Sequence, residues 1–211
     1  MKLIVAGLVG MLVLSGIAHA QSAGDNSSGY VEFVAQSAFG NVTSQSFGVE
    51  GGVALTPSLA IFAEAGMVRD AAPKSIGASA QIIANSLGAG SGYSVRQPIG
   101  FGIVGIRYSF PFREKLHPYV TAGGGLARVK RDVTFSVGGT DVTGKLDTYG
   151  VVLGTDLSGT ESKPMLSVGG GVVWNATGSL FFDAGYRFGR IMTDPTGTNL
   201  NRVGAGIGFS F

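Results

Sequence analysis

The chain has 211 residues, of which 36 are glycine and none is cysteine, and its formal net charge is +2. Because 45% of the residues are hydrophobic and only 13% are charged, the composition excludes a disordered chain, and the lack of cysteine excludes a disulfide scaffold and cysteine-based metal centres. The small net charge and the scattered basic residues argue against nucleic acid as a partner.

The first twenty residues have the pattern of a secretory signal peptide. A positive start and the apolar run Leu3–Leu14 precede a small-x-small cleavage site at residues 18–20. The apolar run is shorter than the ~20 residues of a membrane-spanning helix. We therefore expect residues 1–20 to be removed and residues 21–211 to form one β-barrel domain, with an uncleaved anchor as the alternative.

Beyond this segment, apolar residues alternate with glycine or polar residues, which is typical of β-strands with two different faces. The five clearest segments are 30–36, 47–55, 59–67, 180–188 and 202–211. Three further strand-like segments, Ile99–Phe110, Tyr119–Val129 and Met165–Trp174, have a less certain phase. The apolar parity switches within Ile99–Phe110, which suggests a β-bulge.

These eight segments predict an eight-stranded antiparallel barrel that crosses a membrane, because each has about the ten residues that a tilted strand needs. The short turns are 56–58, 111–116 and 175–178. The long connections are 69–97, 130–163 and 191–200, while the first connection, 41–45, is short. Short periplasmic turns and long extracellular loops are typical of outer-membrane barrels. A ten-stranded barrel that adds Val133–Val137 and Tyr149–Leu153 is the alternative.

Two local motifs complete the pattern. Gly185–Phe188 reads Gly-Tyr-Arg-Phe, and Gly206–Phe211 ends the chain with Phe209 and Phe211. With the signal peptide and the glycine-alternating strands, these motifs resemble the small outer-membrane β-barrel family of the OmpA transmembrane domain and OmpX-like proteins. The resemblance implies an all-β, up-and-down barrel in a Gram-negative-type outer membrane, with Phe209 and Phe211 as a signal for the barrel assembly machinery. Full-length OmpA-type proteins continue into a peptidoglycan-binding domain after the barrel. This sequence stops at Phe211, in the last predicted strand, so we do not expect peptidoglycan anchoring from it.

The alternation also predicts which charged side chains face the barrel interior, because lipid requires an apolar outer face. The inward charged residues are Glu32, Glu50, Glu64, Arg107, Asp183 and Arg187, with Arg128 added if its strand takes the preferred phase. An eight-stranded barrel is just wide enough for side chains, so we expect a buried ion-pair network that fills the lumen. The alternative to this network is that some of these charged side chains lie near the strand ends and are solvated.

Aromatic residues near the strand ends predict girdles at the membrane interface rather than a binding site. They are Tyr108, Phe110, Tyr119, Trp174, Phe209 and Phe211.

No pattern predicts a catalytic residue, a cofactor or a metal site. Gly100–Gly105 matches G-x-G-x-x-G but lies within a strand that no helix follows. His117 is the one histidine of the predicted mature chain, and the spacing places no serine or carboxylate beside it. The acids of the long loops are scattered and are expected to be solvated: Asp132, Asp141, Asp147, Asp156 and Glu161.

The long connections, 69–97 and 130–163, are where an extracellular partner would bind. We expect Ala71–Leu87 to form a short helix over the barrel mouth. The alternating segments Val133–Val137 and Tyr149–Leu153 predict a protruding hairpin whose edge captures a partner by strand addition, with poorly ordered loops as the alternative.

The favoured function is structural or a surface interaction, namely envelope integrity or adhesion-type contacts through the loops. The alternative is a narrow pore for small solutes, although a general porin needs about 16 strands. A lipid-modifying barrel enzyme is the weakest of the three classes, because the expected histidine dyad is missing.

Overall fold

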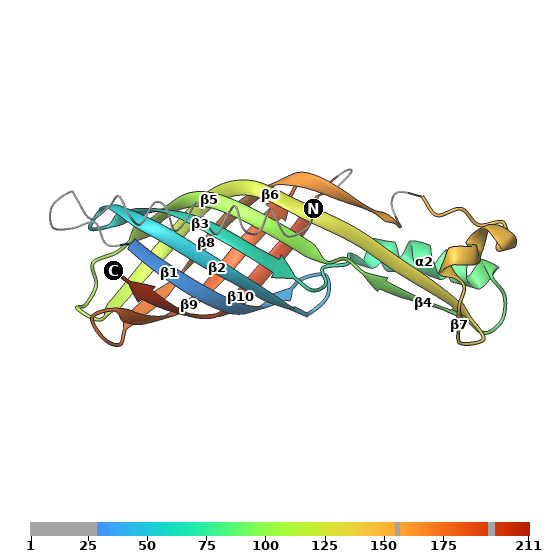
Figure 1. The fold of residues 1–211 in the computed structure, drawn as a ribbon, viewed down its shortest axis with the longest axis horizontal. Coiled ribbons are helices and arrows are strands. Elements are labelled where there is room, and N and C mark those ends of the chain that lie inside the picture. Colours follow the sequence, from blue (N-terminus) through green and yellow to red (C-terminus); the bar gives the residue numbers. More distant parts are fainter. Residues whose placement is uncertain (1–28, 155–156, 194–196) are drawn as a thin grey trace.

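The computed structural model describes residues 29–154, 157–193 and 197–211. The predicted signal peptide, residues 1–20, lies outside this part of the chain. Eight antiparallel strands form the wall of a barrel, and β1 pairs with β10 to close it (Figure 1). The wall consists, in order around the ring, of β1 (Gly29–Phe39), β2 (Ser44–Thr56), β3 (Leu59–Val68), β5 (Ile99–Ser109), β6 (Leu116–Val137), β8 (Gly159–Asn175), β9 (Leu180–Ile191) and β10 (Thr198–Ser210). The predicted eight-stranded barrel is therefore confirmed.

The barrel has a turn end and a loop end. At the turn end short turns join β2 to β3, β5 to β6 and β8 to β9, and Gly29 is hydrogen-bonded to Phe211 there. At the loop end the connections after β3 and β6 contain further secondary structure. No described helix is long and apolar enough to cross a membrane.

Each wall strand presents one apolar face outward, as the alternation predicts. Along β1, Phe33 is half exposed while its neighbour Glu32 is buried, and along β2 Val49 and Glu50 differ in the same way. Inverting the usual apolar interior is favourable only when the outer face meets lipid, where every backbone polar group must be paired within the sheet. The closed ring meets that requirement because it has no free edge.

The predicted β-bulge in Ile99–Phe110 is wrong. The pairing of β5 with β3 and with β6 runs without a shift, and the shift found among the described pairs lies between Ala54 and Thr56. The apolar parity switches because the interior itself becomes apolar toward the loop end, where Ile99 and Phe101 point inward.

The long connections build an extension beyond the barrel at its loop end (Figure 1). The far half of β6 pairs with β4 (Ser91–Arg96) and β7 (Thr140–Asp141), and α2 (Lys74–Ser86) and the short 3₁₀ segment η2 (Thr143–Tyr149) accompany them. The alternative ten-stranded barrel is wrong, because Val133–Val137 is the far part of β6 and pairs with β4 outside the ring, and residues 149–153 form no strand. The helix forms where the sequence predicts it, but α2 lies beside β4 rather than over the barrel mouth.

Candidate functional site

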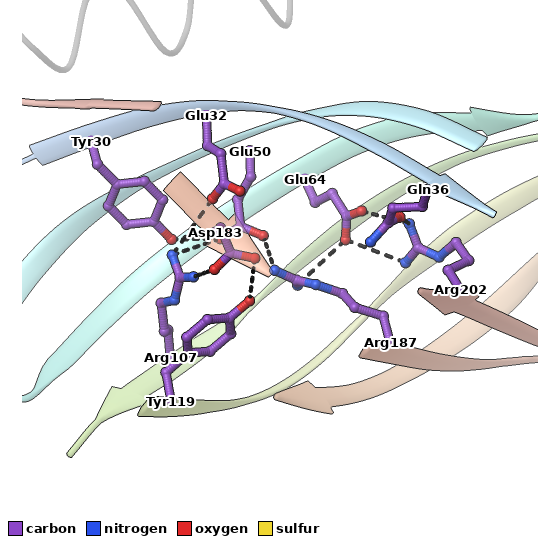
Figure 2. A network of polar contacts seen from close by, with 10 residues as sticks. All are labelled: Tyr30, Glu32, Gln36, Glu50, Glu64, Arg107, Tyr119, Asp183, Arg187 and Arg202. Atoms are coloured by element: carbon purple, nitrogen blue, oxygen red, sulfur yellow. Dashed lines mark hydrogen bonds and ion pairs between the residues drawn. The ribbon is translucent and has the colours of Figure 1, made fainter. Parts of the chain in front are cut away.

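Charged side chains from six strands form a cluster inside the lumen, and Figure 2 shows how they lie. The cluster consists of Glu32, Glu50, Glu64, Arg107, Asp183, Arg187 and Arg202, and each side chain is almost fully buried. The strand register explains the acidic side, because Glu32 is paired with Glu50 across β1 and β2, and Glu50 with Glu64 across β2 and β3. Three carboxylates in a row would repel one another without cations opposite them.

The three arginines supply those cations along the length of the cluster. Arg107 Nη2 lies 3.0 Å from Asp183 Oδ2, and Arg107 Nη1 lies 3.4 Å from Glu50 Oε1. Arg187 pairs with Glu50 through one nitrogen and lies 3.5 Å from Glu64 through the other. Arg202 Nη1 lies 2.6 Å from Glu64 Oε1. Shared carboxylates therefore join all three arginines into one continuous network.

Aromatic rings hold the guanidinium groups in place. Arg107 lies 3.7 Å from the centroid of the Tyr119 ring and 5.1 Å from that of Tyr30. Both tyrosines also donate hydrogen bonds to network acids, Tyr30 to Glu50 at 2.6 Å and Tyr119 to Asp183 at 3.0 Å. These rings add cation–π attraction to the ion pairs of Arg107.

Glu32 differs from the other acids, because its two carboxylate oxygens have no hydrogen-bond partner in the described chain. The nearest cation is Arg107, whose Nη1 lies 3.9 Å from Glu32 Oε2. Gly206 on β10 makes room for the carboxylate, since a β-carbon at that position would overlap Glu32 Oε1. Glu32 is therefore held by the shape of the lumen more than by a direct bond.

An apolar layer fills the lumen on the loop-end side of this network. Its buried side chains are Ala38, Phe62, Val68, Ala71, Ile99, Phe101, Ile103, Ala127, Val129, Met165, Ile191 and Leu200. Arg202 joins the two layers, because its guanidinium lies 4.3 Å from the centroid of the Phe101 ring. At the turn end a cavity of about 480 Å³ reaches inward to Tyr30 and Arg107. Beyond those residues the network and the apolar layer occupy the interior.

The structure places the six predicted network residues inside the barrel and brings them into one cluster. It corrects Arg128, which lies on the outer face, because Ala127 and Val129 on either side of it are buried. The sequence interpretation missed Arg202 as a network member, although it shares the inward parity of Gly204 and Gly206. It also missed Tyr30 and Tyr119 as partners of Arg107.

The aromatic residues predicted as girdles divide into two groups. Tyr119 points into the lumen and is 3% exposed, so its assignment to a girdle is wrong. The others are outward and about half exposed near the turn end: Tyr108, Phe110, Trp174, Phe209 and Phe211.

His117 and the loop acids lie apart from one another. His117 Nε2 lies 3.3 Å from the Glu114 carbonyl oxygen in the turn before β6. Asp132 pairs with Lys130 at 2.8 Å, and Glu161 pairs with Arg131 and Lys163. Among the residues with described positions, no three His, Asp or Glu side chains form a group that could hold a metal ion. Asp156 lies outside the described residues.

The extension has a second, separate core. Its buried side chains are Ala80, Ala84, Leu87, Val133, Phe135, Val142, Leu146 and Leu157. They come from α2, β6, η2 and the connections between them, so the two long loops fold against each other. The predicted hairpin of Val133–Val137 with Tyr149–Leu153 is therefore wrong, because β4 is the partner of β6, and Val151 and Leu153 pack on the core without forming a strand.

Several apolar side chains remain on the surface of the extension. Val152 is 89% exposed and Ile82 is 70% exposed, while Tyr93 and Tyr149 are less exposed. At the end of β7, hydrogen bonds from the Thr143 side chain and backbone hold the pKa of Asp141 below its usual value, so this carboxylate is charged at neutral pH.

No protein-family model and no curated protein matches the chain. Among solved structures, the chain is similar to Neisserial surface protein A, with 17% identity over 88% of this chain and 97% of that one and a TM-score of 0.55. The N-terminal β-barrel domain of Pseudomonas aeruginosa OprF has 18% identity over 88% and 100%, with a TM-score of 0.51. A major outer membrane protein from Thermus thermophilus has 9% identity over 87% and 99%, with a TM-score of 0.54. These likenesses support the predicted fold, that of a small outer-membrane β-barrel.

Proposed function

We propose that the chain is an outer-membrane protein with a structural and surface-interaction role, in which the barrel is a closed anchor and the extension makes contacts outside the cell. In this proposal residues 1–20 direct export, residues 21–211 form the barrel domain, and the terminal Phe209 and Phe211 are recognised by the assembly machinery. The loop end faces the cell exterior and the turn end faces the periplasm.

The filled lumen is the observation that carries the proposal. Both the ion-pair network and the apolar layer lie inside the described barrel, and the seven charged side chains of the network are almost fully buried. A pore needs a continuous polar channel, which an eight-stranded barrel of this kind does not leave. The interior therefore supports a stabilising role rather than solute transport.

The extension supports the second half of the proposal. A folded two-layer unit with its own core holds its surface in a fixed shape. Binding of a partner to this surface therefore costs less conformational entropy than binding to flexible loops would. Exposed Val152, Ile82 and Tyr149 give that surface an apolar character that water alone does not favour. We infer adhesion-type contacts through this surface.

Planar-bilayer recording separates the structural role from the pore. We expect the purified barrel to insert without producing a stable open conductance. A stable conductance that scales with salt concentration would favour the narrow pore and contradict the closed anchor.

An adhesion assay addresses the extension. Cells producing Val152→Asp/Ile82→Asp are expected to bind matrix-coated surfaces less than cells producing the unchanged chain at the same surface level. Thr134→Asp is the matched control, because Thr134 is exposed but polar. Equal adhesion of all three strains would remove the interaction role while leaving the structural role in place.

A further inference from the structure

We propose that the outer surface around Arg128 binds the phosphorylated headgroup of a lipid in the extracellular leaflet. This inference rests on the proposed outer-membrane location of the barrel. It concerns the wall of the barrel rather than its lumen or its extension.

Arg128 marks the place where the lipid-facing surface of β6 changes character. Its outward neighbour toward the turn end is Leu126, which is 62% exposed, and its outward neighbour toward the loop end is Lys130. Across the neighbouring strands, Arg128 is paired with Gly100 on β5, and Gly100 is paired with Met67 on β3, which is half exposed and apolar. Arg128 therefore lies at the loop-end limit of the apolar outer surface of β6, the level at which lipid headgroups begin.

The surroundings of Arg128 leave space for a ligand. On one side Gly100 pairs directly with Arg128, and no heavy atom lies within 4 Å of where a β-carbon on Gly100 or Gly102 would stand, so the two glycines form an open shelf on the wall beside this residue. On the other side, the register places exposed Ser162 of β8 directly opposite Arg128. An arginine fork binds phosphate oxygens in a bidentate manner, and a serine hydroxyl supplies a further donor.

Three other outward cations at this end have local partners. Arg69 donates to Gln45 at 2.7 Å, Arg190 donates to Asn199 at 2.9 Å, and Lys130 pairs with Asp132 at 2.8 Å. Asp132 is the first carboxylate on the outward face of β6, above the level of Arg128. The surface around Arg128 therefore carries a positive charge that a phosphate complements.

Native mass spectrometry of the full chain in zwitterionic detergent tests the proposal, with diphosphorylated lipid A and its dephosphorylated form as probes. The unchanged chain is expected to retain the phosphorylated form about tenfold more tightly, the effect of one charge-assisted hydrogen-bonded contact. Arg128→Gln is expected to abolish this difference. Gly100→Leu is expected to weaken retention without a change in charge, because its side chain would fill the shelf.

Lys115→Gln is the matched control, since Lys115 is an exposed cation in a turn at the opposite end, and it is expected to bind like the unchanged chain. Equal retention of the phosphorylated lipid by Arg128→Gln and the unchanged chain would overturn the proposal. Displacement of the lipid by excess inorganic phosphate would show that the anion alone suffices and would overturn the assignment to a lipid. Failure of the unchanged chain to insert into any lipid membrane would instead contradict the proposed function.

Discussion

The barrel and the extension bury opposite kinds of side chain, although strand β6 runs through both. In the barrel, β6 turns Val120 and Leu126 outward and Thr121 inward, whereas in the extension it turns Thr134 outward and Phe135 inward. The backbone alternates in the same way throughout. The solvent outside each region decides the chemistry, because lipid favours an apolar outer face and water favours a polar one. The inversion begins near Arg128, which makes that residue the boundary between the two regions.

The largest effect is expected in the barrel from Arg187→Met. The substitution leaves Glu50 and Glu64 with one buried cation fewer each, which should lower the free energy of unfolding by about 4 kcal/mol. Urea unfolding in detergent measures the change. Arg96→Met, at an exposed position on β4, is the control and should change stability by less than about 0.5 kcal/mol. An unchanged midpoint for Arg187→Met would show that the network does not stabilise the barrel.

The corresponding change in the extension is Phe135→Ala, which removes a fully buried ring from an apolar core. We expect a local loss of about 3 kcal/mol, with no change in barrel unfolding. Hydrogen exchange at the amides of α2 should become about a hundredfold faster. The exposed neighbour Thr134→Ala should leave exchange unchanged. Simultaneous loss of barrel stability would mean that the two regions do not fold as separate units.

A lysine on the outer face should destabilise the barrel more than the extension. Val104→Lys places a charge on the lipid-facing surface of β5 and should cost about 2 kcal/mol in lipid vesicles. Ser94→Lys, on the exposed face of β4 in the extension, should cost almost nothing. Equal effects at the two positions would contradict a membrane around the barrel.

The smallest expected effect concerns pH and the turn at Asp141. Because the pKa of Asp141 is lowered in the folded chain, its contribution to stability is present above the pKa of an unfolded aspartate and is lost as the pH falls through the folded value. An NMR titration should therefore find its midpoint below that of a free aspartate, and Thr143→Val should move it upward. A normal midpoint in the unchanged chain would contradict the hydrogen bonds from Thr143.

The sequence predicts the fold well where the two faces of a strand differ, and poorly where they do not. Glu32, Glu50, Glu64 and Asp183 stand on strands with clear alternation, so their inward direction follows from parity. Along Tyr119–Val129 three consecutive glycines carry no parity. Leu126 faces lipid, whereas Val129, on the opposite face of the strand, faces the apolar part of the lumen. Because both faces carry apolar residues, the alternation does not show which face points inward, and it assigns both Arg128 and Tyr119 to the wrong face.

The contacts of the extension are harder to predict than the wall, because they join distant parts of the chain. Alternation shows that Val133, Phe135 and Val137 share a face, but it does not reveal that β4 is their partner strand. The exposed position of Tyr93 gives β4 a mixed pattern, so local periodicity identifies no strand there. The helix α2 packs beside β4, and the sequence predicts this helix but not its packing.

Site-specific labelling on intact cells tests most directly the claim that the barrel is anchored in the outer membrane with its extension outside. The chain has no cysteine, so single variants Lys145→Cys in the extension and Lys115→Cys at the turn end provide clean probes. With a membrane-impermeant maleimide, we expect Lys145→Cys to react at once and Lys115→Cys to react only after the outer membrane is permeabilised. Labelling in the reverse order, or equal labelling of both variants on intact cells, would contradict this claim.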